Sequence, residues 1–368
     1  MIMNARLTTP LAFVLQAIAW SPALAQNSLT VPLEAVRISN PDLAPESRGS
    51  VTLFRLHPQY TLRTTQGASS TELSLGALVE RSGNTDLSAN RSLPSVRVLW
   101  ENESPVAVFG LRASLEEAST RETEFADFGR VTLDSKERTG AVGGTWTYNL
   151  TAGTALEVDL SHARVTYDTP LLVNHRETSG SIAYRISASS NARYSLTAGA
   201  SRLTPDGDRV RESRSELGFG YERDLSEGLV LNAAAGAVRT NTVRGKTAPV
   251  GALRLTYTGE RIGYAVAWSR EVSADGVVAG YTRSQVFDAS ATYPLTINTS
   301  FSLGLSHAQS LDGDRDTGSM VYARIQSEIT RFWAVSMSLE QRRARPSGGP
   351  TAKGHSVAIG LVYSHPDF

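Results

Sequence analysis

The stretch Trp333-Ala334-Val335-Ser336-Met337-Ser338-Leu339-Glu340 alternates a large apolar residue with a small or polar one along its whole length. Successive side chains of a β-strand point to opposite faces, so this stretch predicts a strand with one apolar and one polar face. The same period of two recurs in Phe301–His307, Ile262–Trp268 and Tyr194–Ala200. A soluble β-sandwich produces a similar pattern, because one face of each of its strands packs in a core. The alternation therefore predicts an all-β chain without deciding its architecture.

A tyrosine repeat favours a membrane barrel over a soluble β-sandwich. Tyr148, Tyr184, Tyr221, Tyr257 and Tyr293 are separated by 36, 37, 36 and 36 positions, and a polar turn follows each of them. Rings at strand ends form the aromatic girdles of membrane barrels, where they lie at the lipid–water interface. The predicted aromatic girdle consists of Tyr148, Tyr184, Tyr221, Tyr257, Tyr293, Trp333 and Tyr363.

The connections between the predicted strands are of two kinds. Turns such as Asn149–Gly153 are short, whereas the connections at the opposite strand ends are longer and more polar. The longer ones are Asn40–Gly49, Ser82–Ser92, Glu116–Lys136, Asp168–Arg176, Pro205–Arg214, Thr240–Thr247, Leu311–Gly318 and Arg343–Gly354. Short periplasmic turns and long extracellular loops are typical of outer-membrane barrels. With Leu29–Ile38 as the first strand, we predict a transmembrane antiparallel β-barrel of about eighteen strands, with sixteen as the alternative, and both termini in the periplasm.

Composition and charge agree with a barrel. The chain has 36 basic and 36 acidic residues and is 40% hydrophobic. Balanced charge argues against a nucleic-acid partner, and no apolar stretch beyond the N-terminal region reaches the roughly 20 residues of a spanning helix. In hydrocarbon every backbone N–H and C=O must be paired, so a spanning sheet has to close on itself. A barrel of about 16–18 strands encloses an aqueous channel.

The two ends of the chain carry export features. Arg6, the apolar run Leu7–Ala19 and the small residues Ala23 and Ala25 predict a secretory signal peptide over residues 1–25, cleaved after Ala25. Residues 26–368 then form a single barrel domain in the outer membrane. The chain has no cysteine, which excludes a lipid anchor on cysteine and any disulfide. The terminal Phe368 is typical of barrels that the barrel assembly machinery inserts through their last strand.

Alternate positions along each strand face opposite sides of the wall, so odd and even positions separate lipid-facing from lumen-facing residues. Trp100, Trp146, Trp268 and Trp333 fall with the apolar, lipid-facing set. An Arg or Lys facing the middle of the lipid would cost about 2–4 kcal/mol, so the opposite parity is assigned to the lumen. The lumen-lining candidates are Arg97, Glu157, Asp159, Arg185, Arg254, Tyr322, Arg324, Glu328, Glu340 and Arg342. Glu157, Asp159 and Arg185 fall near the same strand ends, which predicts a charge network that holds the wall or sets selectivity.

The longest connection, Glu116–Lys136, contains Phe125 and Phe128. It either folds into the barrel and narrows it or forms an external flap, and we favour the external position. Catalytic and cofactor motifs are absent from the sequence, and the six histidines lack metal-ligand spacing. Ser161 and His162 are adjacent, but neighbouring strand residues point to opposite faces. We therefore predict no enzyme activity, no metal and no cofactor.

Two segments carry a family resemblance: Ile38–Ser47 and Phe54–Leu62, together with hairpins of the Tyr221–Gly228 type. On these residues the chain resembles the β-barrel porin type 2 family. The resemblance implies an outer-membrane barrel associated with exopolysaccharide or capsule secretion, acting beside a periplasmic polysaccharide export protein. Its motifs are turn and strand chemistry, so it assigns no functional residue.

Three functions follow from these observations. The resemblance and the wide predicted lumen favour a conduit for export of a secreted polysaccharide across the outer membrane. The alternative is a general diffusion porin for small solutes, and a minor alternative is a structural or adhesive surface barrel. The expected partners are outer-membrane lipid and lipopolysaccharide, the barrel assembly machinery and the polysaccharide or solute that passes through.

Overall fold

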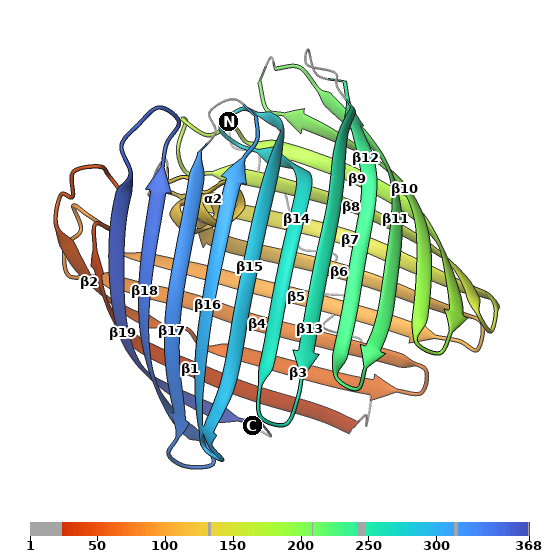
Figure 1. Cartoon of the computed structure of the whole chain (residues 1–368), viewed down its shortest axis with the longest axis horizontal. Helices are drawn as coiled ribbons and strands as arrows, with labels where there is room; N and C mark the ends of the chain where they lie inside the picture. Colours follow the sequence, from red (N-terminus) through yellow and green to blue (C-terminus); the bar gives the residue numbers. More distant parts are fainter. Residues whose placement is uncertain (1–23, 132–133, 208, 242–246, 313–315, 367) are drawn as a thin grey trace, which may run out of the picture.

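The computed structural model describes residues 24–131, 134–207, 209–241, 247–312, 316–366 and 368. Most of them lie in antiparallel strands, which cross in two walls in Figure 1. The strands are β1 (Leu24–Ser39), β2 (Ser50–Leu56), β3 (Gln59–Gln66), β4 (Ser69–Ser82), β5 (Arg91–Glu103), β6 (Ala107–Ser119), β7 (Lys136–Thr151), β8 (Thr154–Tyr167), β9 (His175–Ser189), β10 (Ala192–Pro205), β11 (Glu212–Ser226), β12 (Leu229–Thr240), β13 (Thr247–Thr258), β14 (Gly263–Asp275), β15 (Gly280–Thr296), β16 (Thr299–Ser310), β17 (Thr317–Glu328), β18 (Trp333–Arg345) and β19 (Ala352–His365). One helix, α2 (Thr120–Phe128), interrupts this series in the part of the chain that the structure describes.

The sheet closes into an 18-strand barrel, as the sequence predicts. β1 pairs with β19 from Leu29↔His365 to Ser39↔His355, so the first and last strands are neighbours. β2 and β3 lie end to end on the other edge of β1 and together occupy one strand position. The break between them falls at His57 and Pro58, opposite Pro32 of β1, where two prolines remove backbone donors from the ladder. The backbone N–H of His57 still donates to the carbonyl of Pro32 at 2.9 Å, which keeps the register through the break.

Tight turns gather at one end of the barrel and longer connections at the other. The two strands of the β7–β8 hairpin are joined through Ala152 and Gly153, and those of the β15–β16 hairpin through Ile297 and Asn298. The start of β1 and the end of β19 lie at the tight-turn end. In an outer-membrane barrel this end faces the periplasm and the longer loops face outward.

The outer face of the wall is apolar. Leu160, Leu217, Leu253 and Leu303 are exposed, whereas a residue with such a side chain would be buried in a soluble sandwich. The predicted girdle residues occupy strand positions that point to this outer face, and they lie near the tight turns. There Tyr257 stacks on Tyr264, with 5.0 Å between the ring centroids. An exposed apolar band on a closed barrel makes the protein an integral outer-membrane protein. None of the described helices is long and apolar enough to cross a membrane.

The Glu116–Lys136 connection corrects one prediction. It folds into the barrel rather than forming an external flap, and α2 lies between the two walls in Figure 1. α2 joins β6 to β7 but contacts β15, β16 and β17, which lie on the opposite side of the barrel. Its aromatic residues Phe125 and Phe128 are buried, and this burial holds the segment inside.

Candidate functional site

The segment around α2 narrows the lumen near its outer end, so it defines the candidate functional site. α2 begins after Ser119 and ends at Gly129, whose φ of 71° is the left-handed conformation that glycine adopts without strain. The Ser119 hydroxyl makes no capping bond to the helix and instead accepts a 2.6 Å hydrogen bond from Arg91. The start of the helix is thereby tied to the barrel wall.

On the far wall, Gly129 lies against Gly318 of β17. A β-carbon built on Gly129 would lie 2.2 Å from the backbone nitrogen of Gly318, so neither position has room for a side chain. Next to this contact, the Arg130 guanidinium pairs at 2.6 Å with Asp275 at the end of β14. The Asp275 side chain is 1% exposed, so this ion pair is a buried anchor. The segment therefore spans the lumen and is held at the opposite wall.

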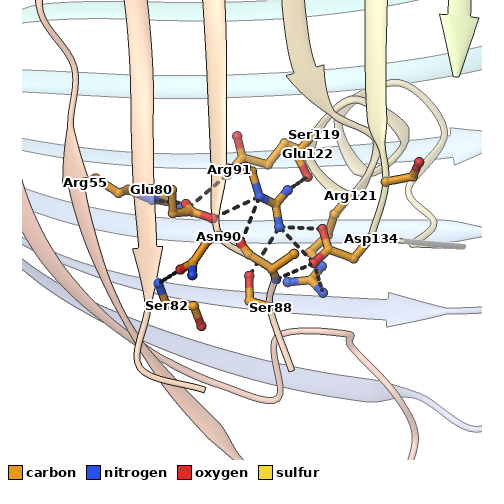
Figure 2. A network of polar contacts seen from close by, with 12 residues as sticks. Arg55, Glu80, Ser82, Ser88, Asn90, Arg91, Ser119, Arg121, Glu122 and Asp134 are labelled. Atoms are coloured by element: carbon orange, nitrogen blue, oxygen red, sulfur yellow. Dashed lines mark hydrogen bonds and ion pairs between the residues drawn. The ribbon is translucent and has the colours of Figure 1, made fainter. Parts of the chain in front are cut away.

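On the near wall, a polar network holds the base of the segment (Figure 2). Its centre is Arg91 of β5, whose side chain is 5% exposed and pairs with Glu80 of β4 at 3.2 Å and with Asp134 at 2.6 Å. Glu80 also accepts a 2.7 Å hydrogen bond from Arg55 of β2, which links three strands to the segment. Because buried charges are stable only when paired, the network fixes these groups as a unit.

Arg121 of α2 adds a second cation to the network. It pairs with Asp42 at 2.6 Å and with Asp134 at 3.2 Å, and it donates to the carbonyl of Leu87 at 3.2 Å. Burial lowers the pKa of Arg121 against the opposing effect of Asp134 and Asp42, although the group stays charged at any physiological pH. Arg121 thus joins the 40–49 and 83–90 loops to the helix.

An apolar cluster completes the packing at this end. Leu43, Phe125, Ala344 and Ala352 are buried together, and the Arg342 guanidinium lies 5.4 Å above the ring of Phe125. Burial of apolar surface contributes roughly 25 cal/mol per Å², so a buried phenylalanine adds substantially to the retention of α2. Ionic, apolar and backbone contacts all hold the segment in the lumen.

Several cavities lie beside the segment, and two of them line the path through the lumen. The first, of about 240 Å³, is lined by residues of β1, β2, β4, β5 and β17–β19 together with Arg121 and Glu122 of α2. Its charged lining groups are Glu34, Arg55, Glu80, Arg91, Arg121, Glu122, Arg324, Glu340 and Arg342. The second, of about 150 Å³, lies between α2, β7–β9 and the end of β14. A solute that passes the constriction therefore meets charges of both signs.

Asp127 lies on the second cavity. Asp127 is partly open to the lumen, but the surrounding walls reduce the hydration of its carboxylate, and Glu271, Glu137 and Asp275 add repulsion. Burial, followed by these carboxylates, raises the pKa of Asp127 to about 6. This acid in the constriction therefore changes charge near pH 6.

In the structure the predicted lumen candidates occupy the strand positions whose side chains point into the lumen. Arg185 pairs with Glu157 at 2.7 Å, whereas Asp159 pairs with Arg112 at 2.7 Å, so the expected three-residue network is two separate pairs. Arg324, Glu340 and Arg342 meet at the first cavity, and the last two pair with each other. The remaining candidates are spread along the wall: Arg97 on β5, Arg254 on β13, Tyr322 and Glu328 on β17.

Several constriction residues were missed from the sequence. Arg55, Glu80 and Arg91 have the inward parity of their strands, so parity could have placed them in the lumen. Arg130 and Asp275 are 145 positions apart, and no local pattern predicts that they meet. Of the predicted cleavage residues, Ala23 lies outside the described residues, as does most of the predicted signal peptide, and Ala25 pairs with Thr64 in the β1–β3 ladder.

The described residues contain no group of three or more His, Asp or Glu side chains placed to hold a metal ion.

No family model matches the chain, and no curated protein is similar to it in sequence. Solved barrels are similar in structure. OccK1 (OpdK) of Pseudomonas aeruginosa has a TM-score of 0.52 at 10% identity, covering 93% of this chain and 99% of that one. OccAB4 of Acinetobacter baumannii has a TM-score of 0.52 at 7% identity, covering 93% and 98%. OccK7 (OpdD) of Pseudomonas aeruginosa has a TM-score of 0.51 at 11% identity, covering 94% and 100%.

The chain has the closed 18-strand barrel fold of these outer-membrane proteins. The comparisons overturn the main functional prediction, because the similar barrels are diffusion porins and none supports polysaccharide export. The resemblance to the β-barrel porin type 2 family correctly indicated a barrel, but the secretion function that it implied is wrong. The similarity to these barrels shows the fold alone, so the absence of enzyme activity stays a prediction.

Proposed function

We propose that the chain is a diffusion porin for small polar solutes, which pass the constriction beside α2. The observation that carries the proposal is a closed barrel whose lumen is narrowed by an anchored inward segment. Such a segment sets an upper limit on solute size. Polar and charged walls replace part of the hydration shell of a solute in transit, so polar molecules cross more readily than apolar ones.

Size supports the choice of small solutes. The first cavity measures about 240 Å³, below the roughly 300–1,000 Å³ of pockets that hold drug-sized ligands. A thicker substrate requires α2 to move, which breaks the Arg130–Asp275 pair and exposes Phe125. Small solutes pass without that cost.

The charges of the constriction bear on ion preference. The more accessible ions of the first cavity are three cations and three anions: Arg55, Arg324, Arg342, Glu34, Glu122 and Glu340. Because both signs are present in similar number, we expect weak selectivity between small cations and anions. Pseudomonas aeruginosa OpdK, which is similar in fold, was solved with vanillate, a small organic acid, and this supports a small-molecule cargo.

Two measurements on the purified full-length barrel test the proposal. In planar bilayers we expect steady open channels with a cation-to-anion permeability ratio near one. In proteoliposome swelling assays we expect monosaccharides and amino acids to enter and sugars of four or more units to be excluded. A barrel with neither conductance nor swelling would contradict the proposal, and so would equal entry of short and long sugars.

A further inference from the structure

The outer surface of the barrel carries basic side chains just above its apolar band. We define the basic belt as Arg37 of β1, Arg81 of β4, Arg202 of β10, Arg239 of β12, Arg343 of β18 and Lys353 of β19. All six are exposed. They lie at the ends of their strands that lead into the longer loops, so they surround the extracellular rim.

Alternation shows that these side chains point away from the lumen. Lys353 lies between buried Ala352 and Gly354, and Arg202 lies between buried Ser201 and Leu203. The other four belt residues likewise each have a buried neighbour in the chain. Because neighbouring strand residues face opposite sides, the belt residues face the membrane side of the wall.

The belt lies at headgroup depth. Lys353 and Arg343 are each four residues from an exposed apolar residue on the same face, Val357 and Leu339 respectively. Four residues of a strand span about 13 Å, and a tilt of about 40° reduces this to roughly 10 Å along the membrane normal. The cations therefore lie where lipid headgroups begin.

The belt lacks counterions within the described part of the protein. Other rim arginines have acidic partners, as in the pairs Arg138–Glu117 and Arg176–Asp206. None of the six belt residues forms an ion pair with another described residue.

Two belt cations are even placed against each other. Arg343 and Lys353 are direct cross-strand partners in the β18–β19 ladder. Opposite residues in a ladder have β-carbons about 4.5–5.5 Å apart, and like charges at that distance destabilise the pair. A bound anion between the two side chains would remove this repulsion and satisfy both donors.

The other membrane interface is built differently. Near the tight turns the outer face carries rings such as Tyr148, Tyr184 and Tyr293, a pattern that suits any phospholipid headgroup region. Exposed arginines at that end lie against rings, as Arg331 does 5.2 Å above Phe332 and Arg223 does beside the Tyr221 hydroxyl. The contrast between this aromatic girdle and the basic belt on the other side matches the asymmetry of the outer membrane. Its outer leaflet is a phosphorylated glycolipid, lipopolysaccharide.

We propose that the basic belt binds the phosphate groups of lipopolysaccharide, with the Arg343–Lys353 pair as one site. Guanidinium groups bind phosphate oxygens through paired N–H donors, and an ammonium adds a point charge. The bound lipid would form a shell that seals the rim of the barrel. The proposal concerns the outer surface and is independent of what passes through the lumen.

The test measures binding of deep-rough lipopolysaccharide to the full-length barrel in zwitterionic detergent by native mass spectrometry. The variant R202Q/R343Q/K353Q removes three belt charges, and R223Q/R261Q/R331Q removes three exposed charges at the tight-turn end as a matched control. Each basic residue near an anionic membrane surface strengthens binding roughly fivefold. We therefore expect a loss of affinity of tenfold or more in the belt variant and less than twofold in the control.

The same lipid without its phosphates distinguishes charge recognition from simple detergent-like packing. We expect the dephosphorylated lipid to bind the unmodified barrel at least tenfold more weakly than the phosphorylated lipid does. This loss should match the loss seen when the belt variant binds the phosphorylated lipid. Equal binding of the two lipids, or equal loss in both triple variants, would overturn the proposal. R343Q alone provides a milder change if the triple variant does not fold, and unaltered channel conductance in either variant separates this result from the proposed porin function.

Discussion

Gly129, the residue that follows α2, and Gly318 of β17 touch backbone to backbone at the far wall of the lumen. A β-carbon added to Gly318 would lie 2.6 Å from the Cα of Gly129, a distance that real β-carbons do not adopt. The pair allows a segment that leaves the wall between β6 and β7 to rest directly on the opposite wall. The width of the pore at this level therefore depends on the absence of two side chains.

We predict that Gly318→Ala widens the channel. The added methyl displaces the end of α2, so single-channel conductance should rise and larger sugars should enter proteoliposomes. Gly218→Ala in β11 is the matched control, because its β-carbon would meet the carbonyl of Ala235 at an ordinary 3.8 Å. Unchanged conductance in Gly318→Ala would show that α2 does not set the pore width.

The Arg130–Asp275 pair gives a second prediction for the same anchor. Arg130→Gln leaves the buried Asp275 carboxylate without its cation, which costs about 3 kcal/mol, or about 100-fold in the equilibrium between docked and released α2. Channel recordings should show frequent transitions to a higher conductance. If the two groups act as a pair, R130Q/D275N should be no worse than the poorer single variant, whereas additive effects would contradict a direct pairing.

The barrel itself could be predicted because its physics is local and repetitive. Alternation such as Trp333–Glu340 follows from the two faces of one strand, and the tyrosine spacing follows from the length of one hairpin. Both recur along the chain, so an error in one hairpin does not change the architecture. The strand count was correct even though Pro32 and Pro58 disturb the first two strand positions.

The constriction could not be predicted because its contacts are distant in sequence. The sequence shows Phe125 and Phe128 in the longest connection, but nothing local distinguishes an aromatic side chain that packs on β18 from one on an external flap. The Gly129–Gly318 contact joins positions that no motif relates. The functional prediction was wrong for a different reason, since turn and strand chemistry is shared by barrels of many functions.

We predict that Arg91→Gln destabilises the whole barrel. The substitution removes the cation that Glu80, with a side chain 4% exposed, shares with Asp134. Arg55 and Arg121 still pair with these two carboxylates, so we expect a cost at the lower end of the about 3–5 kcal/mol for a fully broken buried pair. Urea unfolding in detergent should show a lower midpoint. Arg63→Gln is the control, because the Arg63 side chain is 66% exposed and such a pair contributes about 0–1 kcal/mol. Equal midpoints for the two variants would refute the structural role of the Arg91 network.

Asp127 makes the docking of α2 dependent on pH. Its pKa is raised to about 6 in the docked segment, whereas in a released, hydrated segment it would return to the usual value near 3.9. Between pH 4 and 6 the docked state binds more protons than the released state. Protonation therefore favours docking fully below pH 4, and this contribution is lost as pH rises through 6. We expect transitions to the higher conductance to be rarer at pH 5 than at pH 7.5. Asp127→Asn, which stays neutral throughout, should keep the low frequency at both values, and a pH response of the same size in that variant would assign the effect to another group.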